Sequence, residues 1–267
     1  MLPPDGHVHS EFSWDARRVG SMRATCARAV AIGLPSVAFT EHVDLTPFRA
    51  GFLAGSFGDL VDADGILHAP LPDFDAYAES LDRCRAEFPG LEVLSGREVG
   101  QPHLHVAELA ALPPVDRVVG SLHCLWDEEA SAYAEPWLLF EDRPAPDVFR
   151  DYLAEVCRMG PGDFDTFAHL DYPVRSWPGE FDPRDFEEEL RTALRSLTDR
   201  CLEINTRLPL HPTILRWWAE EGGRRVTFGS DAHEARFVGT GFAQAGERAS
   251  AAGFAPGRRP GDPWVRA

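Results

Sequence analysis

The chain has 267 residues, of which 44% are hydrophobic and 26% charged, a composition typical of a globular protein with a substantial core. Its formal net charge is −17, and such an acidic surface repels phosphate backbones, which argues against a general nucleic-acid binder. Five widely spaced cysteines without a CxxC pair argue against a disulfide framework. The N-terminus lacks a signal-peptide pattern, and no apolar stretch approaches membrane-spanning length. We therefore expect a cytoplasmic protein with no membrane partner.

Short apolar runs and helical patterns alternate seven times along the chain. The predicted strands cover residues 7–8, 36–39, 91–94, 117–119, 166–168, 202–204 and 226–228. The predicted helices cover residues 21–32, 75–87, 105–112, 146–158, 183–200, 212–221 and 241–252. Strands that alternate with helices imply a parallel sheet, and seven units favour a closed or nearly closed barrel, with a flat sheet as the alternative.

Two long segments interrupt this alternation, at residues 45–74 and 125–144. The first is rich in Gly, Asp, Pro and Phe, and the second carries four aromatic residues among acids. Loops of this length in a compact domain are usually functional or disordered, so we expect lid-like loops. We treat residues 1–267 as one domain, with a surface extension at residues 256–267.

Histidines and acidic residues follow the predicted strands at nearly every strand end. They are His7, His9, His42, Glu98, His123, His169, Asp231 and His233. The carboxyl ends of parallel barrel strands open on one face, so these groups should converge there. One histidine at a strand end is usually a packed or surface residue, and the prediction depends on the whole set. Imidazoles and carboxylates together suit Zn, Fe or Mn, which predicts a metal site at this face.

Taken in order, these motifs resemble the PHP (polymerase and histidinol phosphatase) superfamily over about residues 5–245. The segments that carry the resemblance are Asp5-Gly6-His7-Val8-His9, Thr40-Glu41-His42, Arg97-Glu98, Ser121-Leu122-His123, His169-Leu170-Asp171 and Gly229-Ser230-Asp231-Ala232-His233. The stretch Glu203-Ile204-Asn205-Thr206 favours the branch of monofunctional histidinol-phosphate phosphatases. The resemblance implies a distorted (β/α)7 TIM-like barrel of the PHP type.

The resemblance also implies two to three divalent ions, Zn, Mn or Fe. The first ion would be held by His7, His9, Glu98 and Asp231. The second ion would share Glu98 and add His123 and His169. The third ion would be held by His42, His233 and Asp15. Asp15 stands six residues after His9, where the family often has His. A carboxylate is a competent ligand, but this departure weakens the case for full occupancy of the third position and favours a harder metal such as Mn. An N-cap or loop role is the alternative for Asp15.

The activity implied is hydrolysis of a small phosphate monoester, most specifically of L-histidinol phosphate to L-histidinol and phosphate in histidine biosynthesis. As a hypothesis, two ions that share Glu98 lower the pKa of a bridging water, and the resulting hydroxide attacks phosphorus. We predict that Glu98, Asp231 and His233 take part in catalysis. Arg175 and Arg207, which stand next to the motifs, are candidates for binding the phosphate, with surface ion pairs as the alternative.

Three further residues near Glu98 need an interpretation. His103 and His105 form a second HxH pair just beyond Glu98, for which we favour a hydrogen-bonding or substrate-side role over a metal role. Arg97 points away from the side of Glu98 if strand alternation holds, which favours a structural role.

Three alternatives to a histidinol-phosphate phosphatase stay open. An amidohydrolase also begins with an HxH motif, but this chain contains no lysine, so a site with a carbamylated lysine is excluded and only lysine-free variants are left. A PHP phosphoesterase could act on another small ester or a nucleotide, although the charge argues against long nucleic acids. A non-catalytic metal-binding module is the third alternative. Loss of key ligands would support it, but only Asp15 departs from the family pattern. The oligomeric state does not follow from the sequence.

Overall fold

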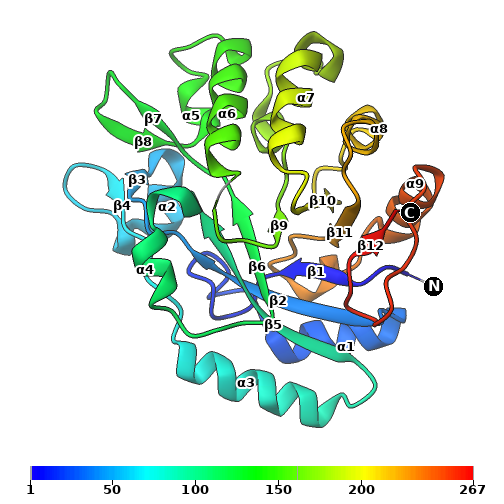
Figure 1. The fold of residues 1–267 in the computed structure, drawn as a ribbon. Helices are drawn as coiled ribbons and strands as arrows, with labels where there is room; N and C mark the ends of the chain where they lie inside the picture. The colour runs from blue at the N-terminus through cyan, green and yellow to red at the C-terminus, as the bar shows by residue number, and fades with distance from the viewer. Residues whose placement is uncertain (1, 161, 267) are drawn as a thin grey trace.

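The computed structural model describes residues 2–160 and 162–266, and its centre is a curled parallel sheet surrounded by helices (Figure 1). The parallel strands are β1 (Asp5–Val8), β2 (Ser36–Val43), β5 (Glu92–Gly100), β6 (Arg117–Ser121), β9 (Thr166–Phe167), β10 (Cys201–Asn205) and β11 (Arg225–Gly229). They lie side by side in chain order. The predicted seven-stranded α/β arrangement is therefore confirmed.

The first and last parallel strands meet, which curls the sheet into a distorted barrel. Val8 forms a parallel bridge with Ala232, just beyond β11. The backbone N–H of His9 donates to Ala232 O at 2.9 Å, and that of Asp231 donates to His7 O at 2.9 Å. The closure consequently brings the motif that follows β1 into direct contact with the motif that follows β11.

The helices cover the outside of the sheet, close to where the sequence predicts them (Figure 1). The longer ones are α1 (Met22–Ile32), α3 (Phe74–Glu87), α4 (Val106–Ala110), α6 (Ala145–Met159), α7 (Glu187–Ser196), α8 (Pro212–Glu220) and α9 (Phe242–Ala251). Local signals set several boundaries: Ser21 caps α1 by accepting from Ala24 N, and Gly33 ends that helix with φ of 76°. The helix expected over residues 183–200 is shorter, because residues 183–186 form the 3₁₀ turn η5 (Pro183–Phe186).

Two central strands are longer than the sequence predicts. The backbones of β2 and β5 pair continuously from Ser36 opposite Glu92 to Val43 opposite Val99. His42 and Glu98 therefore lie within strands, as directly opposed partners, and not just beyond the strand ends. A buried polar residue interrupts the apolar pattern that reveals a strand, so the sequence pattern stops too early at both positions.

The segments 45–74 and 125–144 differ from the expected lid-like loops, because much of each is ordered into short elements. They contribute β3 (Phe48–Arg49), β4 (Ile66–Leu67), β7 (Leu125–Asp127) and β8 (Ala132–Ala134). These strands form a second sheet in the order β4-β3-β8-β7, in which Phe48 pairs with Tyr133. Trp14, Phe48 and Leu67 pack into a separate small hydrophobic cluster there. Movement of these segments as lids stays a prediction.

Short helices complete the second sheet and the connections. They are α2 (Ala54–Phe57), α5 (Pro136–Leu139), η1 (Gly51–Leu53), η2 (Gly58–Leu60), η3 (Pro102–Leu104), η4 (Tyr172–Ser176) and η6 (Ala235–Phe237). Near the C-terminus, β12 (Trp264–Val265) pairs antiparallel with β11, so the expected surface extension in fact continues the main sheet. Among the described residues, none of the helices is long and apolar enough to cross a membrane.

Asp5 stabilises the closure of the barrel through buried hydrogen bonds. Its side chain is fully buried, Oδ1 accepts from Ser230 N at 3.0 Å, and Oδ2 accepts from Gly239 N at 3.2 Å. We expect Asp5→Ala to lower the free energy of unfolding by about 2–4 kcal/mol, because two buried backbone donors lose their acceptor. Urea unfolding of the metal-free protein, with Asp64→Ala in an exposed turn as the control, measures this change. Equal stability of the two variants would contradict the role of Asp5.

Candidate metal centre

The predicted strand-end groups converge at one end of the barrel. At least one of them lies within two residues of the carboxyl end of every parallel strand except β10. Six of these side chains are buried, with at most 8% of their surface exposed: His7, His9, His42, Glu98, His169 and Asp231. The topology therefore concentrates imidazoles and carboxylates in one site, as the sequence predicts.

Glu98 lies at the centre of this site and contacts five imidazoles. Its Oε2 lies 3.2 Å from His7 Nε2, 3.4 Å from His9 Nε2 and 3.3 Å from His42 Nδ1. On the other side, Oε1 lies 2.8 Å from His169 Nε2 and 3.3 Å from His123 Nε2. The two oxygens thus face two separate groups of nitrogen donors.

Asp15 joins the site from the segment that follows β1. Its Oδ2 lies 2.6 Å from His233 Nε2 and 3.5 Å from His42 Nε2. The His9 ring stacks on the His42 ring at 4.3 Å between centres, and the tilted His233 ring lies at the same distance. The residue that departs from the family pattern therefore contacts both of the partners that the sequence assigns to it.

Asp231 connects the histidines to the two candidate phosphate-binding arginines. Its Oδ1 lies 3.4 Å from His9 Nε2, and its Oδ2 accepts from Arg175 Nη2 at 2.6 Å. Arg207 Nη1 reaches Oδ1 at 3.4 Å and is about half exposed. Both guanidinium groups therefore lie at the edge of the histidine cluster, within reach of an anion bound there.

Three sets of these side chains offer donor atoms within 4.8 Å of one another, the spacing that a shared ion requires. The sets are His7, His9 and Glu98; His42, Glu98 and His123; and His9, His42 and His233. Their imidazole and carboxylate donors suit Zn, Mn or Fe. The residues thus fit a metal centre. His42 also lies close to Glu98, whereas the sequence motifs grouped His42 with Asp15 and His233.

The electrostatics of the site also fit bound cations. Burial disfavours a charged imidazole, and together with His42 and His233 it lowers the pKa of His9 to about 3, so His9 offers a free lone pair. Burial alone would raise the pKa of Glu98, yet the surrounding histidines hold it well below its usual range. Asp15 Oδ1 is buried without a hydrogen-bond partner, and His42 Nδ1 faces the Asp44 and Glu98 carboxylates at 3.2 and 3.3 Å without forming a hydrogen bond, so a bound ion would satisfy both atoms.

Two site residues hold unusual backbone conformations. His169 has φ of 25° and Asp231 has φ of 51°, both in the left-handed region that residues other than glycine rarely adopt. Strain of this kind is commonly stored where side chains must point in a required direction. Here it turns two side chains into the site just beyond β9 and β11.

Four polar residues that the sequence did not assign a role hold the histidines in place. Glu203 Oε1 lies 2.7 Å from His7 Nδ1, and Glu203 Oε2 accepts from His169 N at 2.9 Å. Ser13 Oγ lies 3.0 Å from His9 Nδ1 and donates to Glu41 Oε2 at 2.8 Å. Glu41 and Glu203 belong to the quoted motifs, whereas Ser13 and Asp44 carry no recognisable pattern.

Asp44 holds two histidines at once, because its Oδ2 lies 3.2 Å from His42 Nδ1 and its Oδ1 lies 3.2 Å from His123 Nδ1. We expect Asp44→Asn to weaken metal affinity by roughly 10- to 100-fold, because an amide has one acceptor oxygen where the carboxylate has two. Competition with a chromogenic zinc chelator measures the affinity, and Asp64→Asn in the exposed turn is the matched control. Unchanged affinity would show that Asp44 does not orient the two imidazoles.

The second HxH pair lies outside the three sets of candidate ligands. His103 Nε2 lies 2.6 Å from Glu155 Oε1, and His105 Nε2 lies 2.7 Å from Thr46 Oγ1. These contacts agree with the hydrogen-bonding role favoured from the sequence. Arg97 donates to Pro113 O on the far side of β5 from Glu98, which agrees with its expected structural role.

A cavity of about 490 Å³ opens over the site. One part of its lining is charged and includes Glu98, Arg175 and Asp231, and another part is aromatic and includes Trp14 and Trp137. The aromatic part comes from the segment after β1 and from both segments of the second sheet. The second sheet therefore supplies part of the wall of the cavity.

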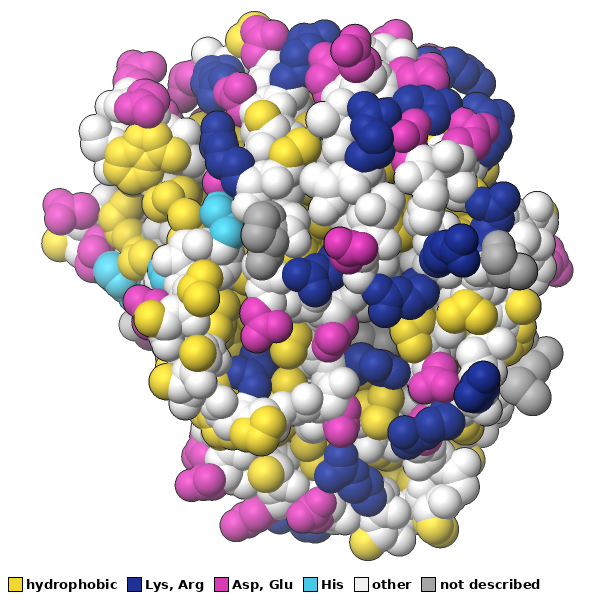
Figure 2. All heavy atoms as spheres, in the orientation of Figure 1, with side chains coloured by type: hydrophobic (Ala, Val, Ile, Leu, Met, Phe, Trp, Pro, Cys, Tyr) yellow, Lys and Arg dark blue, Asp and Glu magenta, His cyan; other side chains and the backbone are white. Residues whose placement is uncertain are grey.

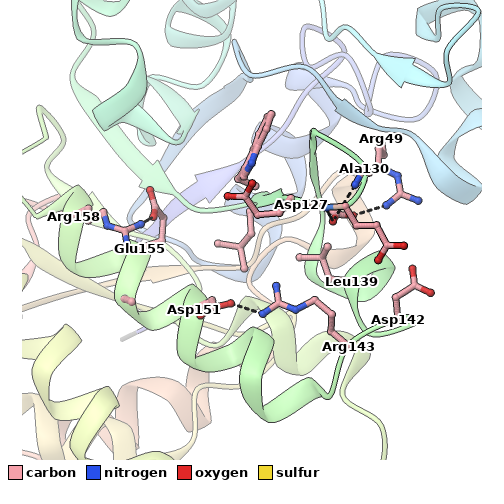
Figure 3. A pocket seen from close by; sticks show the side chains of 14 residues that line it. Arg49, Asp127, Ala130, Leu139, Asp142, Arg143, Asp151, Glu155 and Arg158 are labelled. Carbon is pink, nitrogen blue, oxygen red and sulfur yellow. Dashed lines mark hydrogen bonds and ion pairs between the residues drawn. The ribbon is translucent and has the colours of Figure 1, made fainter.

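A second hollow, of about 670 Å³, lies between the second sheet and α6. Figure 3 shows that its arginines point at neighbouring acids: Arg143 at Asp151 and Arg158 at Glu155. Arg49 likewise pairs with Asp127 at 2.8 Å. Because these guanidinium groups are already paired with acids, we expect this hollow to bind an anion more weakly than the cavity over the histidine cluster.

The fold and the site define an α/β barrel with a candidate metal centre at the carboxyl ends of its strands. The PHP domain family matches residues 5–207, and the chain belongs to this family. The resemblance seen in the sequence motifs is thereby confirmed.

Similar proteins include a histidinol-phosphatase of Lactococcus lactis, which is 28% identical over 254 residues, covering 88% of this chain and 86% of the relative. A probable histidinol-phosphatase of Clostridium acetobutylicum is 26% identical over 259 residues, covering 90% of each chain. The crystal structure of the Lactococcus lactis histidinol phosphate phosphatase, complexed with zinc, L-histidinol and phosphate, matches with a TM-score of 0.76 and 24% identity over 95% of both chains. This structural likeness establishes the shared fold.

Proposed function

We propose that this protein is a metal-dependent phosphatase that hydrolyses L-histidinol phosphate to L-histidinol and phosphate. The observation that carries the proposal is the arrangement around Glu98, whose two oxygens face two groups of imidazoles next to a pair of arginines. The family and the names of the similar proteins support the same reaction.

The metal ligands that we propose are the residues expected from the sequence. They are His7, His9, Asp15, His42, Glu98, His123, His169, Asp231 and His233. Divalent ions held there would supply Lewis acidity towards the phosphoryl oxygens and would activate water for attack on phosphorus. Whether two or three ions bind, and whether they are Zn, Mn or Fe, is decided by metal analysis of the purified protein.

The protein's own side chains would position the substrate. Arg175 and Arg207 would bind the phosphoryl oxygens and stabilise the negative charge that develops on them during the reaction. Asp231 would hold Arg175 in its position through the 2.6 Å ion pair. Trp14 and Trp137 in the cavity wall would exclude water from the bound ester.

A small substrate also fits the surface of the protein. On the face that Figure 2 shows, arginine side chains are interspersed with acidic ones. This mixture gives the face no broad positive field of the kind that attracts a nucleic-acid backbone. The formal charge of −17 points the same way.

The experiment that tests the proposal measures phosphate release by metal-stripped protein reloaded with Zn, Mn or Fe. L-Histidinol phosphate is compared with simple alkyl phosphates, sugar phosphates and nucleoside monophosphates. We expect metal-dependent turnover with kcat/KM for L-histidinol phosphate at least about 100-fold above the other esters, a preference of about 3 kcal/mol. Preference for another ester would replace the substrate, and absence of hydrolysis with every metal would overturn the enzymatic proposal.

A further inference from the structure

Glu135 places an acidic side chain in the wall of the cavity, away from the histidine cluster. It follows β8 directly and precedes α5, so the second sheet positions it. It lines the same cavity as Glu98, Arg175 and Arg207. No sequence motif includes it, and the phosphate chemistry proposed above does not use it.

The hydrogen bonds of Glu135 fix one of its oxygens and leave the other available. Tyr172 Oη donates to Oε2 at 2.7 Å, and Trp137 Nε1 donates to the same oxygen at 2.9 Å. Among the described residues, no side chain or backbone group donates to Oε1, and no Arg or His lies within 4.0 Å of the carboxylate. The geometry therefore holds the carboxylate rigidly with one acceptor oxygen free.

Its partly buried environment disfavours the charged form of the Glu135 carboxylate unless a cation lies next to it. Burial raises the pKa of the Glu135 carboxyl above its usual range, and the hydrogen bond from Tyr172, the more distant His123 and the hydrogen bond from Trp137 only partly offset that effect. Other acids of the cavity wall have cationic neighbours, as Asp231 has Arg175. A half-buried acid that is not directly paired with Arg or His is the kind of group that a cationic ligand stabilises.

Tyr172 connects Glu135 to the candidate metal centre. The Tyr172 ring lies 5.1 Å from the His169 ring and 5.2 Å from the His123 ring, and the Arg175 guanidinium lies 4.9 Å from the Tyr172 ring centre. The hydroxyl at the far end of this ring bonds to Glu135. One tyrosine side chain therefore separates a region that attracts phosphate from a carboxylate that attracts a cation.

We propose that Glu135 binds a positively charged nitrogen in the alcohol portion of the substrate while the phosphate lies at the arginines and the metal centre. This proposal rests on the proposed phosphatase function. It adds that the site selects phosphate esters of amino alcohols over esters of uncharged alcohols. Trp137, which donates a hydrogen bond to Glu135, packs against Phe52 with ring centres 4.3 Å apart and provides an apolar surface beside the charge. L-Histidinol phosphate offers two candidates: its amine, and its imidazole when that ring is protonated.

Glu135→Gln tests the proposal, because the amide keeps an oxygen that can accept from Tyr172 and Trp137 but removes the charge. Three esters are compared: L-histidinol phosphate, 2-amino-3-phenylpropyl phosphate, which keeps only the amine, and 3-phenylpropyl phosphate, which has neither nitrogen group. We expect kcat/KM to fall by about 10- to 100-fold for the cationic esters and by less than about threefold for the neutral ester. A loss confined to L-histidinol phosphate would place the imidazole at Glu135, and a loss for both cationic esters would place the amine there.

Binding of the separate products gives a second readout that does not depend on turnover. Inhibition by L-histidinol should weaken in Glu135→Gln, and inhibition by inorganic phosphate should not change. Glu135→Asp should keep a preference for cationic esters, because it keeps the charge. Asp142→Asn, in the neighbouring hollow of Figure 3, is the matched control and should leave all these constants unchanged.

Three results would overturn the proposal. Equal losses for all three esters would indicate that Glu135 donates a proton to the leaving group, and unchanged selectivity would show that it does not contact the substrate. Wild-type turnover of all three esters at equal kcat/KM would leave the phosphatase function intact and remove this inference alone. Conversely, a preference for 2-amino-3-phenylpropyl phosphate that Glu135→Gln abolishes, without turnover of L-histidinol phosphate, would retain the role of Glu135 and refute the proposed substrate.

Discussion

Glu98→Gln should lower kcat for L-histidinol phosphate by at least about 1000-fold while the protein remains folded. A loss of this size corresponds to about 4 kcal/mol of transition-state stabilisation, which is within the range that a bound metal supplies. The reason is the position of the carboxylate, whose two oxygens lie between His7, His9 and His42 on one side and His123 and His169 on the other. The amide is nearly the same size but carries no charge and cannot bridge two ions.

Metal content separates this explanation from simple loss of structure. We expect mass-spectrometric metal analysis to find at least one ion fewer per chain in Glu98→Gln than in the wild type, with a similar circular dichroism spectrum. Glu129→Gln, an exposed acid in the turn between β7 and β8, controls for the loss of one negative charge. Wild-type kcat in metal-replete Glu98→Gln would refute the shared-ligand arrangement.

The candidate site could be predicted because its groups follow a rule of the fold. Once seven strands alternate with helices, residues such as His7, His123 and His169 must lie on one face, however far apart they are in the sequence. The exact strand ends did not matter: His42 and Glu98 lie inside longer strands than expected and still reach the site. Convergence therefore depends on topology, which the alternation of elements reveals well.

Asp44, Ser13 and Glu135 could not be predicted in the same way. Asp44 follows His42 at the spacing that places both on one side of a strand, a weak signal that many surface acids share. Glu135 acquires its position from the second sheet, whose strands of two or three residues are too short to show a period. That sheet pairs Phe48 with Tyr133, and a pairing between such distant segments cannot be predicted from a single sequence.

The charge distribution explains how an acidic protein can still bind a phosphate ester. Most acids of the chain lie on the outside, whereas the site combines a cluster of histidines with Arg175 and Arg207. Of these two arginines, Arg175 is the better placed, because it is largely buried and held by Asp231, whereas Arg207 is about half exposed. A charge in a poorly solvated site interacts more strongly with an anion than one at the surface.

This difference predicts the order of effects when each arginine is replaced by methionine. Arg175→Met should lower kcat/KM for L-histidinol phosphate by about 100-fold or more, and Arg207→Met by about tenfold or less. Inhibition by inorganic phosphate should weaken in the same order, because the same guanidinium groups would bind the free anion. Arg184→Met, on an exposed turn, is the control for loss of a positive charge.

Metal content and stability decide what a large effect of Arg175→Met means. Arg175 Nε is buried without a hydrogen-bond partner, and Nη2 bonds only to Asp231 among the described residues, so the guanidinium has donors left for an anion. Removing it should not reduce metal content, because Asp231 loses a competing cation and becomes freer to bind an ion. A variant with full metal content, a wild-type unfolding midpoint and weakened phosphate inhibition would place Arg175 at the phosphate. Lost metal with unchanged phosphate inhibition would instead show that Arg175 acts by holding Asp231 in place.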